Sequence, residues 1–192
     1  MARTALITRN TKETQIQLKL DLDGGPVAVE TGIGFFDHML TAFGFYSGFG
    51  LELKAAGDLY VDGHHTVEDV GICLGMAIRE ALGDKRGIAR FGTTYIPMDE
   101  ALCRTVLDIS NRPFLVFDAE MPQAMIGAYD SCLTEEFMRA VAMNAGITLH
   151  ICCEYGKNAH HITEAIFKSF GAALKTAVKV DGDRVVSTKG VL

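Results

Sequence analysis

Several features that mark broad classes of protein are missing from this chain of 192 residues. It has no uncharged run of about 18 apolar residues that would span a membrane, and its N-terminal residues lack the apolar stretch of a signal peptide. Its four prolines form no proline-rich linker between domains. Basic residues are outnumbered, with 18 Lys and Arg against 24 Asp and Glu. We therefore expect a cytoplasmic protein that binds neither nucleic acid nor membranes.

Cysteine is too scarce and too irregularly spaced to form a disulfide framework or a zinc-thiolate site. The chain has five cysteines, an odd number, and none shows the spacing of paired zinc ligands. We interpret them as reduced, mostly core-filling side chains. They are Cys73, Cys103, Cys132, Cys152 and Cys153.

The chain does contain an internal duplication. Residues 50–82 match residues 146–178 without a gap when the sequence is shifted by 96 positions, half its length. Histidine, of which there are six, is among the matched types, so chance similarity between two amphipathic helices is a poor explanation. The matched pairs include Gly50 and Gly146, His64 and His160, His65 and His161, Glu68 and Glu164, and Gly75 and Gly171.

Hydrophobic periodicity predicts similar elements in each half. Helices are expected at about 34–46, 64–83, 131–144 and 159–179, with Asp62 and Asn158 as N-caps of the second and fourth. Strands are expected at 3–8, 15–21, 50–56, 90–97, 102–109, 113–118 and 146–151. Each half then follows roughly a β-β-α-β-α order. This predicts an α+β fold with two mixed sheets, each with helices on one face, in one domain 1–192 built of two pseudo-repeats at about 1–88 and 89–192.

The duplicated His-His-x-x-Glu motif carries the chemistry. On a helix, residues i and i+4 share a face, so His64 lies beside Glu68 and His160 beside Glu164. The second histidine of each motif points about 100° away and cannot easily join its neighbour at the same ion. If two motifs face each other, one site collects His160, Glu164 and His65, and the other collects His64, Glu68 and His161. The facing copies can belong to one chain or to two.

A further ligand for each site is sought on the preceding helix. His38 precedes His64 by 26 residues, and Glu136 precedes His160 by 24. If the duplication extends this far, Glu136 occupies the place of His38. Imidazole and carboxylate ligands without thiolate suit Mn, Fe, Zn, Co or Ni.

These motifs, extended to their neighbours, resemble the signatures of the imidazoleglycerol-phosphate dehydratase family. The resemblance rests on residues 34–40, 62–69 and 156–168, on Lys12-Glu13-Thr14 and on the C-terminal residues 187–192. It runs from end to end. It implies the fold of ribosomal protein S5 domain 2, two Mn²⁺ ions per active site, and a homo-oligomer of 24 subunits with active sites between subunits.

The resemblance also assigns residues. One metal would take His38, His65, His160 and Glu164, and the other His64, Glu68, His161 and Glu136, where many relatives have histidine. The substrate phosphate would meet Arg90, Arg112, Lys168, Ser187, Thr188 and Lys189, and the rest of the substrate would contact Glu13 and the metal ligands His38, His64, His65, Glu68 and His160. Catalytic roles are expected for Glu13, His64, Glu68, His161, Glu164 and Lys168.

The implied reaction removes water from D-erythro-imidazoleglycerol phosphate in histidine biosynthesis. The proton that leaves is bound to a carbon that is not next to a carbonyl, so a metal on the imidazole ring would have to help. Glu13 is the candidate base for that proton. Two other functions fit the same ligands: a dinuclear hydrolase of a phosphorylated small molecule, which would release phosphate, and a metal-storing shell, which would not explain Lys168, Arg90 and Arg112.

Overall fold

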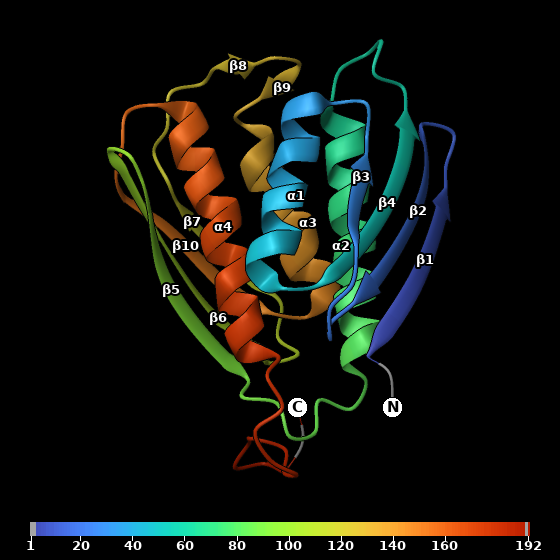
Figure 1. Cartoon of the computed structure of the whole chain (residues 1–192), viewed down its shortest axis with the longest axis vertical. Helices are drawn as coiled ribbons and strands as arrows, with labels where there is room; N and C mark the ends of the chain where they lie inside the picture. The colour runs from blue at the N-terminus through green and yellow to red at the C-terminus, as the bar shows by residue number, and fades with distance from the viewer. Residues whose placement is uncertain (1–2, 191) are drawn as a thin grey trace.

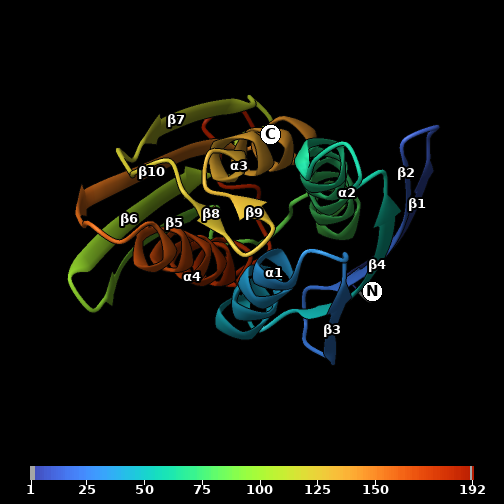
Figure 2. The ribbon, with the colours of Figure 1, turned by 90° about the horizontal axis from the view of Figure 1, so that it is seen from above.

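The computed structural model describes residues 3–190 and 192. Residues 1, 2 and 191 of the expected domain lie outside the described part. Two four-stranded sheets enclose a central layer of four helices (Figures 1 and 2). No described helix is both long and apolar enough to cross a bilayer. The predicted α+β fold, with helices on one face of each mixed sheet, is confirmed.

The first sheet has the order β1-β2-β4-β3, in which only β3 runs parallel to its neighbour β4. Helices α1 and α2 cover its inner face (Figure 2). Burial alternates along β2, so that the apolar Ile16, Leu18 and Leu20 face the helices while the residues between them face solvent. The elements of this half are β1 Thr4–Asn10, β2 Thr14–Asp21, β3 Val27–Glu30, α1 Gly34–Ser47, β4 Gly50–Gly57 and α2 His64–Leu82.

The second sheet repeats this topology in the order β5-β6-β10-β7, with β7 parallel to β10. A two-stranded hairpin of β8 and β9 precedes the third helix and has no counterpart in the first half. The elements are β5 Phe91–Met98, β6 Ala101–Asp108, β7 Phe114–Asp118, β8 Met125–Ile126, β9 Tyr129–Asp130, α3 Leu133–Ala145, β10 Thr148–Tyr155 and α4 Ala159–Ala177.

The helices pack in two pairs, α2 with α3 and α1 with α4, and glycines bring each pair close. A Cβ on Gly75 would stand 2.7 Å from the Val141 carbonyl oxygen, and a Cβ on Gly171 would stand 2.8 Å from the Phe43 carbonyl oxygen. Both distances are shorter than carbon–oxygen contacts allow, so these backbones approach only because the residues are glycine. The matched Gly75 and Gly171 therefore have a packing role.

The structure corrects the sequence-based elements at two points. The first half contains β3, a short strand that the periodicity did not predict, so each four-stranded sheet has three strands that precede the first helix of its half. Gly63, rather than Asp62, is the N-cap of α2, although the Asp62 carboxylate still accepts a hydrogen bond from the His64 backbone N–H at 2.8 Å. Asn158 caps α4 as predicted. All five cysteines are free, but only Cys73 and Cys103 are fully buried.

Candidate active site

The two His-His-x-x-Glu motifs form the first turns of α2 and α4, at the same end of the helix layer (Figure 1). Local hydrogen bonds hold both helix starts, since a polar side chain two residues before the first His of each motif accepts from that histidine's backbone N–H. The acceptors are Asp62 at 2.8 Å from His64 and Asn158 at 2.9 Å from His160. Such contacts satisfy N–H groups that have no partner within the helix.

One cluster of possible metal ligands forms within the single chain. His38 from α1 meets His160 and Glu164 from α4, and one ligand atom from each residue lies within 4.8 Å of the other two. Glu164 Oε2 is 3.2 Å from His160 Nε2 and 3.7 Å from His38 Nε2. Among the residues that the structure describes, this is the one group of three such side chains.

The wall of this cluster is aromatic. The Phe35 ring packs edge-on against His160, with centroids 4.8 Å apart, and against Tyr129 at 5.4 Å. Tyr129 comes from the hairpin present only in the second half, is fully buried, and exchanges a hydrogen bond with the Thr134 hydroxyl at 3.0 Å. The hairpin thus helps to fix the orientation of the His160 ring.

Glu164 is a buried carboxylate with a cationic partner. Burial opposes its ionisation, but Lys168, whose Nζ donates to Glu164 Oε1 at 2.7 Å, and the nearby His38 outweigh burial, so the pKa of Glu164 lies below its ordinary value. The Lys168 side chain is itself only 14% exposed, and its ammonium lies 5.4 Å from the centre of the Tyr46 ring. Lys168 therefore lies on the face of α4 that carries His160 and Glu164, as its sequence spacing predicted.

The second predicted ligand set is not gathered within the single chain. His64 Nε2 lies 3.9 Å from Glu68 Oε2, but Glu136 forms ion pairs of its own with Arg139, at 3.8 Å. The equivalence of Glu136 and His38 is nevertheless supported by the strand after each helix, because β4 begins at Gly50 and β10 at Thr148, 98 residues apart. The predicted match of Gly50 with Gly146 is therefore wrong, because Gly146 ends α3 as Gly48 ends α1. The same shift of 98 carries His38 onto Glu136.

The second histidine of each motif is turned away from its neighbour and is held by a carboxylate at Nδ1. His65 Nδ1 lies 3.0 Å from Asp58 Oδ2, and His161 Nδ1 lies 2.6 Å from Glu100 Oε2. These hydrogen bonds raise the pKa of both histidines, and they lower the pKa of Glu100 to about 2. A carboxylate on one ring nitrogen is the usual support for a histidine that binds metal through the other. Sequence analysis missed Asp58 and Glu100.

The two halves differ in which acid faces the other ring nitrogen, Nε2: Glu13 lies near His65 Nε2, and Asp99 lies 3.6 Å from His161 Nε2. The hairpins β1-β2 and β5-β6 correspond, since β2 begins at Thr14 and β6 at Ala101, 87 residues apart, so Glu13 and Glu100 are equivalent. In the second half Glu100 binds His161 Nδ1. In the first half Asp58 takes that role, and Glu13 faces Nε2 of His65 at 3.9 Å. Gly156 is the counterpart of Gly57, because a Cβ on Gly57 would meet Thr66 and Thr14 and a Cβ on Gly156 would meet the equivalent Ile162 and Ala101. Lys157 therefore takes the place of Asp58, and Glu100 is the carboxylate at His161 Nδ1.

A buried network holds the turn that carries Glu13. The Asp69 carboxylate, on α2, accepts a hydrogen bond from the Arg9 guanidinium at 2.9 Å and a short one from the Thr14 hydroxyl. Thr11 Oγ1 in turn accepts from the backbone N–H groups of Glu13 at 3.1 Å and Thr14 at 2.9 Å. Asp69 is 6% exposed. This network ties the Glu13 turn to the helix that carries His65, and no sequence motif indicated it.

The predicted phosphate-binding residues other than Lys168 meet at the other end of the molecule, whereas Lys168 lies beside Glu164 in the histidine cluster. A hollow of about 580 Å³ is lined by Arg90, Phe91, Arg112, Val186, Ser187, Thr188 and Lys189. Arg90 is anchored there, because its guanidinium pairs with Asp108 at 2.7 Å and its backbone N–H donates to the Ala177 carbonyl at 2.8 Å. Ala177 ends α4, and His160 lies in its first turn, so about 25 Å of helix separates this hollow from the histidine cluster.

Comparison with known proteins decides the family. The family model for imidazoleglycerol-phosphate dehydratase matches residues 31–174. The chain belongs to this family. The imidazoleglycerol-phosphate dehydratase of Ruminiclostridium cellulolyticum is 56% identical over 99% of this chain and 100% of its own length. That of Lactococcus lactis subsp. cremoris is 58% identical over 99% of this chain and 98% of its own length.

Solved structures of the family share the fold. The dehydratase from Staphylococcus aureus superposes with a TM-score of 0.85 at 44% identity, covering 92% of this chain and 99% of its own. The dehydratase from Pyrococcus furiosus gives 0.86 at 42% identity, covering 97% of this chain and 100% of its own. As a member of the imidazoleglycerol-phosphate dehydratase family, the chain is an enzyme of the hydro-lyase class.

The donor set of the cluster fits a metal ion. Two imidazoles and a carboxylate converge from His38, His160 and Glu164, and no cysteine takes part. Such ligands suit divalent transition metals rather than calcium or magnesium, which prefer oxygen alone. The carboxylates on His65 and His161 are further support for histidines prepared to bind metal.

Proposed function

We propose that the chain catalyses the metal-dependent dehydration of D-erythro-imidazoleglycerol phosphate to imidazole acetol phosphate, a step of L-histidine biosynthesis. The observation that carries the proposal is the pairing of the His38, His160 and Glu164 cluster with a separate cationic hollow around Arg112 and Lys189. An imidazole ring suits the first and a phosphate the second. The expected cytoplasmic location remains a prediction.

We further propose that two Mn²⁺ ions serve each active site. His38, His160 and Glu164 would hold one ion together with a crossing His65, and His64, Glu68 and Glu136 would hold the other together with a crossing His161. A bound metal would act as a Lewis acid that makes the substrate imidazole easier to deprotonate. Glu136 in place of the more frequent histidine keeps a ligand that manganese accepts.

The chain's own residues supply the remaining steps. The pairing of Lys168 with Glu164 keeps that carboxylate ionised and directed at the cluster. Glu13, held beside His65 by the Asp69 network, would take the proton from the substrate carbon. Arg112, Ser187, Thr188 and Lys189 would hold the phosphate, since Arg90 is already paired with Asp108 and orients the hollow.

The distances within one chain support an active site shared between subunits. The substrate places its phosphate only a few bonds from its ring, whereas the length of α4 separates the hollow from the histidine cluster. His65 also stands apart from that cluster within the described residues. We therefore propose that one subunit binds the ring and another binds the phosphate, in a homo-oligomer for which the family implies 24 subunits.

A turnover assay tests the reaction. Enzyme stripped with a chelator would be offered imidazoleglycerol phosphate, and imidazole acetol phosphate would be followed before and after Mn²⁺ is restored, with free phosphate measured in parallel. We expect product only with metal and no release of phosphate. Phosphate release would favour the hydrolase alternative, and metal binding without any product would favour the storage alternative.

A further inference from the structure

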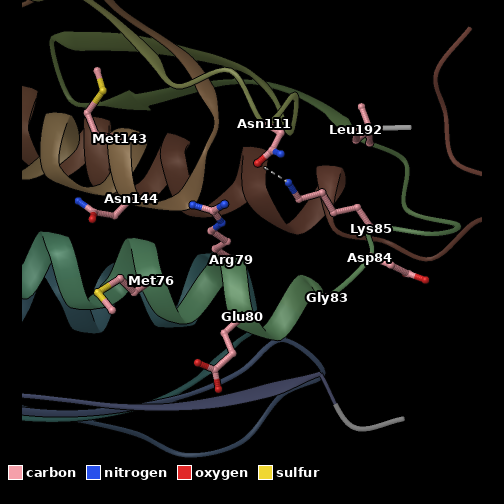
Figure 3. Close-up of a pocket in the computed structure, with 10 residues that line it drawn as sticks. All are labelled: Met76, Arg79, Glu80, Gly83, Asp84, Lys85, Asn111, Met143, Asn144 and Leu192. Carbon is pink, nitrogen blue, oxygen red and sulfur yellow. Dashed lines mark hydrogen bonds between the residues drawn. The ribbon is translucent and has the colours of Figure 1, made fainter. Parts of the chain in front are cut away.

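A second cationic pocket lies where α2 and α3 end, and the proposed reaction does not use it. Its volume is about 680 Å³, and it is bounded by the ends of both helices, the connection after α2 and the turn at Asn111 (Figure 3). It shares no lining residue with the hollow around Arg112. The lining residues are Met76, Arg79, Glu80, Gly83, Asp84, Lys85, Asn111, Met143, Asn144 and Leu192.

The unusual residue of this pocket is Lys85. It is only 6% exposed, although lysine is rarely buried without a carboxylate partner. Its Nζ donates to the Asn111 side-chain oxygen at 3.2 Å, and no carboxylate in the described part of the chain lies within ion-pair distance. Two of its three ammonium N–H donors are thus left for another acceptor. Burial lowers the pKa of Lys85, and the charge of Arg79 lowers it further.

The backbone conformation of Lys85 is also unusual. Its φ of 59° lies in the left-handed region, and Asn111 opposite has a φ of 57°. A left-handed conformation costs a lysine free energy, so surrounding structure must maintain it. This conformation directs the ammonium group of Lys85 into the pocket.

The other polar groups complete a cationic site. The Arg79 guanidinium and the Asn111 and Asn144 amides lie around the same space as the Lys85 ammonium (Figure 3). Glu80, Asp84 and the C-terminal residue Leu192 also line the pocket. Figure 3 shows the Glu80 and Asp84 carboxylates directed away from the Lys85 ammonium. Asp84 pairs instead with Arg86, at 3.8 Å.

We propose that this pocket binds a phosphoryl dianion, either free phosphate or a phosphate monoester, through Lys85 and Arg79. Two cations match a dianion, and a guanidinium together with amide N–H groups matches several phosphate oxygens at once. The bound anion would supply the counter-charge that buried Lys85 lacks within the chain. The site is separate from the proposed active site, so it can be occupied together with substrate.

Equilibrium dialysis of the metal-loaded, full-length enzyme against radiolabelled inorganic phosphate tests the proposal. We expect two classes of phosphate site in the unaltered protein. Arg112→Ala should weaken one class, and Lys85→Met or Arg79→Gln should weaken the other by about tenfold or more. Arg79→Gln changes an exposed side chain, so it guards against loss of folding in Lys85→Met. Glycerol 3-phosphate in a parallel dialysis distinguishes esters from free phosphate.

The matched control is Lys54→Met, on β4. Lys54 does not line the pocket, its side chain is 75% exposed, and its ion pair in the described structure is with Glu30. This control should bind phosphate as the unaltered enzyme does. The proposal is overturned if Lys85→Met and Arg79→Gln, both folded, retain every phosphate site, or if the only site lost in any variant is the one at Arg112.

Discussion

Lys168 Nζ lies 2.7 Å from Glu164 Oε1, one helical turn further along α4, and both side chains are largely buried. The equivalent of Lys168 in the first half is Ile72, so the two His-His-x-x-Glu motifs differ in charge although they match in ligands. This pair keeps the carboxylate ionised through Oε1 alone. The second oxygen, Oε2, faces His160 and His38.

Replacing Lys168 by Met should destabilise the metal-free protein at neutral pH. Removing one partner of a buried pair leaves Glu164 short of a hydrogen-bond donor, at a cost of about 1–3 kcal/mol. The lowered pKa of Glu164 stabilises the fold above the unfolded-state pKa, and this stabilisation is lost as pH falls through the folded-state value. The difference in Tm from the unaltered protein should therefore persist from pH 7 down to about 4.5 and shrink as the pH falls further.

The control for this experiment is Lys175→Met, at an exposed lysine on the same helix. It should leave Tm nearly unchanged at every pH when protein concentration is held fixed. A Lys168→Met variant with the same Tm as the unaltered protein at pH 7 would contradict the role of the pair.

Glu13→Gln should lower kcat by roughly 10²- to 10⁴-fold, the contribution usual for a general base. Its metal content should not change, because Glu13 is 3.9 Å from His65 and is not among its proposed ligands. Glu100→Gln is the matched variant, at the equivalent position of the second hairpin. It should instead weaken metal binding by about 10- to 100-fold, because Glu100 orients His161. Normal turnover in Glu13→Gln would exclude the role.

Asp69→Asn should lower kcat by loosening the turn that carries Glu13. The variant loses the charge that Arg9 pairs with, and it weakens the hydrogen bond from Thr14. We expect a fall of about tenfold in kcat with little change in KM, because positioning of a catalytic group acts on the chemical step. In a Glu13→Gln background, Asp69→Asn should have almost no further effect on kcat. Full additivity of the two changes would show that Asp69 acts elsewhere.

Glu136 can be tested through metal content alone. Glu136→Ala should lose one of the two expected metal ions per chain, measured by elemental analysis after dialysis, while Glu136→His should keep both. Glu135→Ala is the control, since the neighbouring Glu135 is paired with Arg139 one turn further along α3. Equal metal content in Glu136→Ala and Glu135→Ala would remove Glu136 from the ligand set.

Mixing two inactive variants tests the shared active site. His160→Ala should lack ring binding and Arg112→Ala phosphate binding. If each active site draws these residues from different subunits, mixed assemblies should regain about a quarter of full turnover, because some interfaces receive both intact parts. Assemblies reformed from either variant alone serve as controls. Mixed assemblies as inactive as either parent would place both parts in one chain.

Much of the fold could be predicted from the sequence, because the signals for it are local. Helical periodicity located all four helices to within two residues, and a matched repeat revealed the duplication. The i, i+4 spacing was enough to predict that His160 and Lys168 both lie beside Glu164. The four-residue strand β3 was missed because so short a run carries too little alternation to stand out.

What the tertiary structure alone decided depends on residues brought together from distant parts of the chain. The shift of 96 aligned α2 with α4. The hairpin of β8 and β9 adds residues between the first strands and the first helix of the second half only, so the same shift could not reveal that Glu13 and Glu100 are equivalent. The roles of Asp58, Asp69 and Lys85 followed only from their contacts and burial. Spacing along one helix is set by backbone geometry, whereas contacts between elements depend on how the whole chain packs.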